Sequence, residues 1–215
     1  GESMHIKFAV FVAVRIAEAL HTAHTLEDES GDQTPVVHRD VSPDNILISS
    51  HGNPQLADFG VAQLATELQQ KQNQPVRGKA SFLSPEALQP DLGPVDGRSD
   101  IFSLGTVLYQ ALTGEAPFER EGRDQTLKAI LLDAPPVPSA RRPEVPEQLD
   151  AIVKQSLAKK PDERFQSARE FQNALEEALQ AIGIVSERRF GEWIDELVDR
   201  AARIEENADS SRSAG

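Results

Sequence analysis

Three polar residues early in the chain are of the types that bind a hard divalent cation and accept protons. Asp40 follows a histidine and an arginine, Asn45 lies five positions later, and Asp58 lies 58 − 40 = 18 positions after Asp40. Carboxylate and amide oxygens are ligands that Mg²⁺ prefers, together with water and phosphate. Any one of these residues alone would most often be a solvated loop residue. The three together favour a magnesium-dependent site.

Short apolar runs flank these residues and predict the strands that would position them. Val36-Val37 precedes Asp40, and Ile46-Leu47-Ile48 follows it. Gln55-Leu56-Ala57 follows a turn-forming stretch at 51–54 and leads into Asp58. The sequence therefore predicts strand, loop, strand, turn, strand, with the polar residues at the strand ends.

The remaining elements are predicted to be helices. Residues 8–20 are apolar on nearly every side, which is typical of a buried helix. A second apolar helix is predicted to be capped by Ser99-Asp100 and to end at Gly114. Further helices are predicted over 124–132, 147–158, 167–179 and a last segment after Gly183.

Composition and charge narrow the class of protein. The chain has 215 residues, of which 39% are hydrophobic and 27% charged, as expected for a folded domain. Lys and Arg number 22 against 35 Asp and Glu, giving a net charge of -13 that disfavours nucleic acid and membrane surfaces as partners. There is no cysteine and no apolar run of membrane-spanning length, so a cytoplasmic location is expected.

A further motif, Ser84-Pro85-Glu86, follows a long polar segment over 61–80. With it, five stretches occur in a fixed order: VVHRDVSPDNILIS, LADFGVAQ, GKASFLSPEAL, SDIFSLGTVLYQALTGEAPF and KKPDERFQSA. In these stretches the chain resembles the eukaryotic-like protein serine/threonine kinases of bacteria, specifically their C-terminal lobe. The resemblance implies a mainly α (α+β) fold, a helical lobe with a few short strands around the catalytic loop.

The resemblance also implies a reaction and its residues. ATP and Mg²⁺ would be the cofactors, and a protein hydroxyl would be the substrate. Asp40 would accept the proton of that hydroxyl, and Asn45 and Asp58 would hold Mg²⁺ beside the nucleotide. Leu47 matches the residue beneath the adenine ring.

Other residues match structural positions of the family. Asp100 matches a carboxylate that holds the backbone of the catalytic loop, because a buried carboxylate needs donors. Glu86 and Arg164 match a buried ion pair behind the activation segment. The full set with expected structural roles is His38, Arg39, Phe59, Gly60, Glu86, Asp100 and Arg164.

Two positions depart from the commonest family pattern. Ser42 stands where the catalytic loop usually has a lysine, and Lys79 stands where a threonine usually follows the glycine. One hypothesis is that the two have exchanged roles, with Lys79 facing the phosphate and Ser42 supplying the hydroxyl. The alternative is that Lys79 points to solvent.

Arg39 before the catalytic aspartate is typical of kinases whose activation segment is ordered by phosphorylation, since arginine pairs with phosphate. Between Gly60 and Ser84 the only hydroxyl side chains are those of Thr66 and Ser81. Thr66 is therefore the expected phosphorylation site, and the alternative is that it is an exposed polar residue.

Nothing before residue 8 resembles the glycine-rich strands of a kinase N-terminal lobe. The expected division is a kinase C-terminal lobe over 1–180, an amphipathic helical extension over 181–205 and a disordered tail or linker over 206–215. The missing lobe would belong to the same or a separate chain, so the fragment alone is expected to be inactive. The alternative function is a non-catalytic, pseudokinase-like interaction module.

The extension carries one apolar stripe, whose members are Phe190, Trp193, Ile194, Leu197, Val198, Ala201 and Ile204. Packing of this stripe on the lobe itself is the expected arrangement. Dimerisation or a link to a following domain is the alternative.

Overall fold

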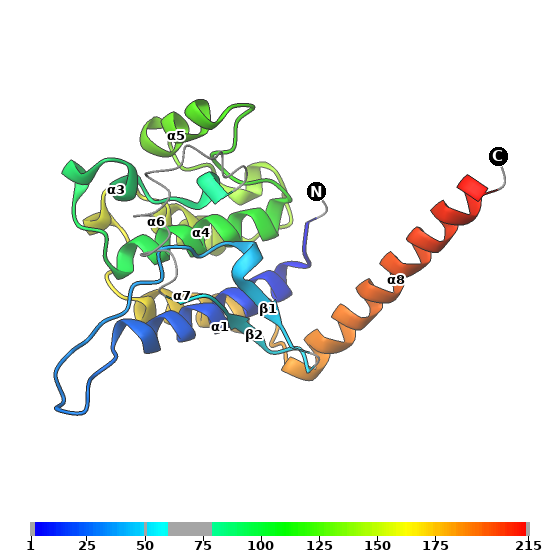
Figure 1. Ribbon diagram of the computed structural model, residues 1–215, viewed down its shortest axis with the longest axis horizontal. Coiled ribbons are helices and arrows are strands. Elements are labelled where there is room, and N and C mark those ends of the chain that lie inside the picture. Colours follow the sequence, from blue (N-terminus) through cyan, green and yellow to red (C-terminus); the bar gives the residue numbers. More distant parts are fainter. Residues whose placement is uncertain (1–2, 50, 60–78, 214–215) are drawn as a thin grey trace.

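Two largely apolar helices, α1 (Ile6–His24) and α4 (Gly97–Thr113), form the centre of the fold. In this computed structural model, which describes residues 3–49, 51–59 and 79–213, α1 packs against α4 and against α7 (Ala168–Ile182) (Figure 1). Side chains on all sides of α1 are buried, as expected for a helix that contacts neighbours around its whole circumference. The two predicted buried helices are confirmed.

Shorter helices surround this pair. They are α3 (Pro85–Leu88), α5 (Arg123–Leu132) and α6 (Glu147–Ser156), and a long final helix, α8 (Glu187–Ser213), follows α7. Single turns of 3-10 helix lie at Pro43–Asn45, Lys79–Phe82, Pro90–Leu92, Pro138–Ala140 and Pro161–Glu163. The mainly helical fold class is confirmed.

Within the described residues there is one two-stranded antiparallel sheet. It pairs β1 (Ile46–Ile48) with β2 (Pro54–Leu56), and Ile46 lies opposite Leu56. Strand β2 packs against α1, so the hairpin rests on the helical body. The hairpin is the element that follows the catalytic-loop motif and leads to Asp58.

Two predicted local features are wrong. Val36-Val37 forms no strand, because it has no strand partner and the Val36 N–H donates instead to the Ala23 carbonyl, at 2.9 Å. Helix α4 is capped by Asp96, whose carboxylate accepts the N–H of Arg98. Ser99 and Asp100 lie inside the first turn of α4 and use their side chains for other contacts.

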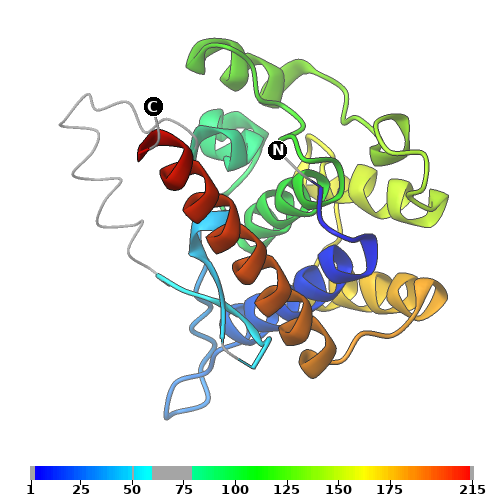
Figure 2. The ribbon, with the colours of Figure 1, turned by 90° about the vertical axis from the view of Figure 1, so that its right-hand side faces the viewer.

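Helix α8 begins against the body and then projects away from it (Figure 1; Figure 2 shows it passing in front of α1). Phe190 is fully buried and its ring lies 5.5 Å from that of Phe8 and 5.3 Å from that of Phe11. Val198, further along, is 61% exposed. The backbone stays helical beyond residue 205, where a tail was expected, and the domain division at 180 and 205 stays a prediction.

No helix in the described part of the chain is both long and apolar enough to cross a bilayer.

Candidate active site

The backbone of the loop that contains His38 and Arg39 is held by one buried carboxylate, that of Asp100 in the first turn of α4. Its two oxygens accept the backbone N–H groups of His38 and Arg39, each at 2.8 Å. The His24 Nε2 atom, from the last turn of α1, lies 2.8 Å from the same carboxylate. Asp100 is completely buried, so these three donors replace the water that an ionised carboxylate needs.

His38 is fixed on both ring nitrogens. Its Nδ1 accepts the backbone N–H of Asp40 at 3.2 Å, and its Nε2 lies 2.8 Å from the carbonyl oxygen of Ala57. An amide N–H can only donate and a carbonyl can only accept, so both bonds require the neutral ring with its proton on Nε2. The histidine thus connects the loop before β1 to the segment after β2.

Asn45 is aligned toward Asp40. Its Nδ2 donates to the Asp40 carbonyl oxygen at 2.6 Å and to the Asp40 carboxylate at 3.0 Å. Because both bonds use the amide nitrogen, the Oδ1 atom of Asn45 remains an acceptor for another group. The backbone carbonyl of Asn45 accepts the Ala57 N–H at 2.9 Å, which brings the residue before Asp58 to the same end of the hairpin.

Two residues of the site have left-handed backbone conformations, which are uncommon for residues with a side chain. Arg39 has φ 66° and Asp58 has φ 64°. Such conformations persist only where surrounding contacts hold them, and they concentrate at functional sites. Here Asp100 holds Arg39, and the Phe59 ring packs edge-on against His38, with 4.6 Å between centroids.

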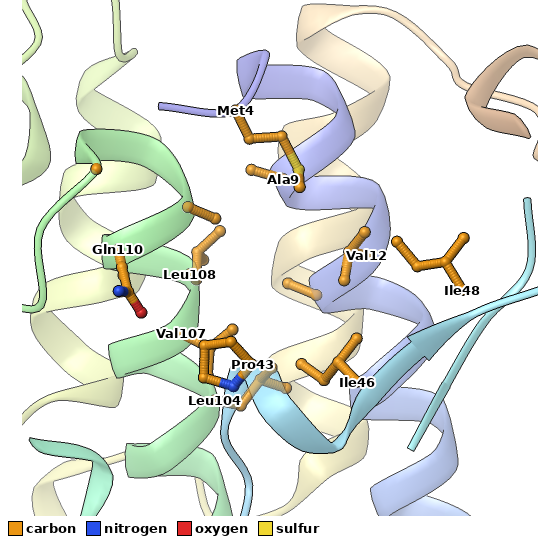
Figure 3. Close-up of a pocket in the computed structure, with 13 residues that line it drawn as sticks. Met4, Ala9, Val12, Pro43, Ile46, Ile48, Leu104, Val107, Leu108 and Gln110 are labelled. Atoms are coloured by element: carbon orange, nitrogen blue, oxygen red, sulfur yellow. The ribbon is translucent and has the colours of Figure 1, made fainter. Parts of the chain in front are cut away.

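The two faces of β1 have different surroundings. Leu47 is 54% exposed, while Ile46 and Ile48 point into an apolar pocket of about 400 Å³ between α1, α4 and the loop residue Pro43 (Figure 3). Alternation along a strand places successive side chains on opposite faces. Leu47 therefore lies on the accessible face of β1, on the side away from the pocket.

The residues that depart from the family pattern are only partly described. Ser42 is 1% exposed, and its Oγ atom has no hydrogen-bond partner within the described residues. Lys79 begins a 3-10 turn, and its side chain lies outside the described part. Gly60 and Thr66 also lie outside the described residues.

A buried ion pair joins α3 to Arg164, which precedes α7. Arg164 Nη1 and Nη2 donate to the two oxygens of Glu86 at 2.8 and 2.7 Å, and both side chains are inaccessible to solvent. Arg164 also donates to the carbonyls of Ala158, Lys159 and Arg98, so none of its three nitrogens lacks a partner. The pair is therefore fully satisfied, as a buried pair must be.

The contacts of two residues at this site differ from what the sequence predicts. His24 lies beyond the helix predicted over residues 8–20, yet it contacts Asp100 across 76 positions of chain. Ser99 was taken as a helix cap, yet its hydroxyl donates to Glu86 at 2.5 Å. Nothing in the sequence next to either residue indicates these partners.

With this geometry established, comparisons with known proteins identify the family. Residues 2–180 match the family model described as the protein kinase domain. The chain is 38% identical over 186 residues to the serine/threonine-protein kinase Pkn1 of Myxococcus xanthus, covering 84% of this chain and 25% of that protein. It is 39% identical over 168 residues to the tyrosine-protein kinase MasK of Myxococcus xanthus, covering 78% of this chain and 26% of that protein.

A solved structure agrees with these sequence matches. The crystal structure of the PknI kinase domain of Mycobacterium tuberculosis superposes with a TM-score of 0.56 at 30% identity, covering 82% of this chain and 56% of that one. The chain therefore belongs to the protein kinase domain family. It spans about a quarter of the length of the curated relatives it matches.

The Glu86–Arg164 pair gives a prediction about stability. Replacing Glu86 with glutamine leaves the Arg164 charge buried without its counterion, and we expect the free energy of unfolding at neutral pH to fall by about 3 to 5 kcal/mol. Chemical denaturation measures this loss. Glu177→Gln on the exposed side of α7 makes the same chemical change and should have little effect.

The Glu86–Arg164 pair also makes the stability of the fold depend on pH. Burial alone would raise the pKa of Glu86, but the hydrogen bonds and charge of Arg164, with the Ser99 hydroxyl, hold that pKa below its ordinary value. Because the folded-state pKa is the lower one, the stabilisation is present above the unfolded-state pKa of about 4.3 and is lost as the pH falls through the folded-state value. The stability difference between the wild type and Glu86→Gln should therefore shrink below about pH 4, and a constant difference would contradict this assignment.

Proposed function

We propose that this chain is the C-terminal lobe of a protein serine/threonine kinase, which transfers the γ-phosphoryl group of ATP to a serine or threonine hydroxyl of a protein. The observation that carries the proposal is the bonding of Asn45 to both the carbonyl and the carboxylate of Asp40. This contact joins the proposed base to a proposed metal ligand. Asp58 follows at the same end of the hairpin, because Ala57 bonds back to Asn45.

Asp40 is the proposed proton acceptor. In the transfer, the substrate hydroxyl oxygen forms a bond to the γ-phosphorus, the bond from that phosphorus to the β,γ-bridging oxygen breaks, and ADP leaves. The hydroxyl proton goes to the Asp40 carboxylate. Asn45 orients that carboxylate through the 3.0 Å bond to one of its oxygens.

Asn45 and Asp58 are the proposed magnesium ligands. The donor set fits the ion, because one amide oxygen and one exposed carboxylate are hard ligands on a short hairpin. No group of three or more His, Asp or Glu within the described ranges could hold a metal without other ligands, so nucleotide phosphates and water would complete the site. When bound, the ion neutralises charge on the phosphates.

Leu47 is the proposed floor beneath the adenine ring, and its exposed position on β1 supports this role. The other wall of the nucleotide cleft would come from a kinase N-terminal lobe in the same or a separate chain, and the lobe alone would be inactive. A cytoplasmic site of action suits an ATP-dependent reaction and a chain without cysteine.

The role of Asp40 is tested in the natural gene product that contains this sequence, with Mg-ATP and casein as substrates. We expect Asp40→Asn to lower kcat by about 10²- to 10⁴-fold with little change in the KM for ATP, since a general base acts on the chemical step. Asp44→Asn, an exposed residue of the same loop, is the matched control and should retain activity.

Phosphoamino acid analysis of the product distinguishes the hydroxyl class. Phosphoserine and phosphothreonine are expected, and phosphotyrosine alone would refute the proposed substrate class. Full activity in Asp40→Asn would refute the assignment of the base. No transfer by the wild-type protein would favour the alternative, a non-catalytic interaction module.

The hypothesis that Ser42 and Lys79 have exchanged roles is tested in the same assay. If Lys79 neutralises the phosphate, Lys79→Ala should lower kcat about 10-fold or more, whereas Lys128→Ala on the exposed side of α5 should not. The buried Ser42 hydroxyl has no hydrogen-bond partner within the described residues, so it is available to the group that the exchange hypothesis requires. Unchanged turnover in Lys79→Ala would mean that this lysine points to solvent.

A further inference from the structure

Helix α8 lies beyond the part of the chain that matches the kinase family. The family match ends at residue 180, and α8 begins at Glu187. The helix nevertheless makes a specific contact with the turn of the β1–β2 hairpin, and the two proposed magnesium ligands flank the other end of that hairpin. The family relationship therefore does not account for what α8 does there.

The contact is between two glycines. A Cβ atom added to Gly52, in the hairpin turn, would lie 2.3 Å from the Glu187 carbonyl oxygen and 2.4 Å from the Gly191 nitrogen. A Cβ atom added to Gly191 would lie 3.2 Å from the Gly52 nitrogen. Distances this short mean that the backbones of the turn and of the first turns of α8 touch directly. Gly52 is buried as a result.

Neighbouring side chains fix α8 in this position. Phe190, next to Gly191, is 0% exposed and packs on the rings of Phe8 and Phe11 from α1. Glu187 pairs with Arg15 of α1 at 3.3 Å. The start of α8 is therefore docked on α1, the same helix that supports β2.

The hairpin needs such support. Each strand has three residues and the described sheet has only these two strands, and an isolated two-stranded hairpin is marginally stable in water. The turn that meets α8 lies at one end. Asn45 and Asp58 flank the strands at the other end, where the Ala57 N–H bonds to the Asn45 carbonyl.

We propose that α8 is a positioning element for this site: its contact through Gly191 with Gly52 holds the hairpin so that Asn45 and Asp58 keep their relative placement. Gly191 and Gly52 are positioning residues, since neither reaches the reacting groups. Their effect on metal binding rests on the proposed function of Asn45 and Asp58. Their effect on the stability of the hairpin does not depend on that proposed function.

The experiment uses the full 215-residue chain, isotopically labelled for NMR, and Mn²⁺ alone as the probe. Gly191→Leu inserts a side chain between α8 and the turn, while leucine is a better helix former than glycine, so the helix itself is not weakened. Asp195→Leu, at an exposed position of the same helix, is the matched control.

Two readouts are measured on each variant. The first is hydrogen exchange of the Ala57 amide, with the Leu108 amide of α4 as an internal reference for global stability. The second is paramagnetic broadening of the Asn45 side-chain amide and the Asp58 backbone amide during Mn²⁺ titration. In Gly191→Leu we expect faster exchange at Ala57 with unchanged exchange at Leu108, and about fivefold weaker Mn²⁺ binding. Asp195→Leu should match the wild type in both.

The outcomes separate the two proposals. If Mn²⁺ broadens neither signal in the wild type, Asn45 and Asp58 do not hold the ion without nucleotide phosphates, and exchange at Ala57 still decides whether α8 positions the hairpin. If Gly191→Leu leaves Ala57 unchanged, or if both variants alter it equally, the positioning role is overturned. Should Gly191→Leu fail to fold, Gly191→Ala replaces it, with a smaller change of the same sign expected; no change there overturns the role.

Discussion

The hydrogen bonds of the buried Asp100 carboxylate are the interactions on which the conformation of the loop around His38 and Arg39 depends. An ionised carboxylate without water is tolerated only when donors surround it, and here the donors come from the loop backbone and from His24 at the end of α1. The requirement acts in both directions. Helices α1 and α4 have to pack closely enough to place the Asp100 carboxylate beside the loop. The loop has to adopt the conformation in which its N–H groups reach that carboxylate, and this includes the left-handed backbone of Arg39.

The other hydrogen bonds of the site depend on the loop that Asp100 holds. The loop that Asp100 holds presents His38, which bonds the segment after β2, and Asn45, which bonds Asp40. None of these segments is long or regular enough to hold its shape alone. Each is fixed by hydrogen bonds to a buried polar group, and the Glu86–Arg164 pair does the same for α3. Buried polar networks of this kind specify one geometry because any alternative leaves a group unpaired.

Much of this arrangement could be predicted from the sequence, but not all of it. Apolar patterning located α1 and α4, and motif spacing pointed to Asp40, Asn45 and Asp58 as a group. The strand at Val36-Val37 was mispredicted because an apolar pair indicates burial and cannot tell whether a strand partner exists. The role of His24 was missed because its partner is 76 positions away, and the Gly52–Gly191 contact was missed because close approach between two backbones has no local sequence pattern.

Asp100→Asn shows whether Asp100 determines the conformation of the loop around His38 and Arg39. Asparagine keeps the shape but replaces one acceptor oxygen with an NH₂ group that faces backbone donors. Hydrogen exchange of the His38 and Arg39 amides, measured by NMR in the wild type and the variant, reports on the bonds themselves. We expect much faster exchange at both amides and a displaced Asn45 side-chain amide signal, with the amides in the centre of α7 protected as before. Unchanged exchange at His38 and Arg39 would contradict this role of Asp100.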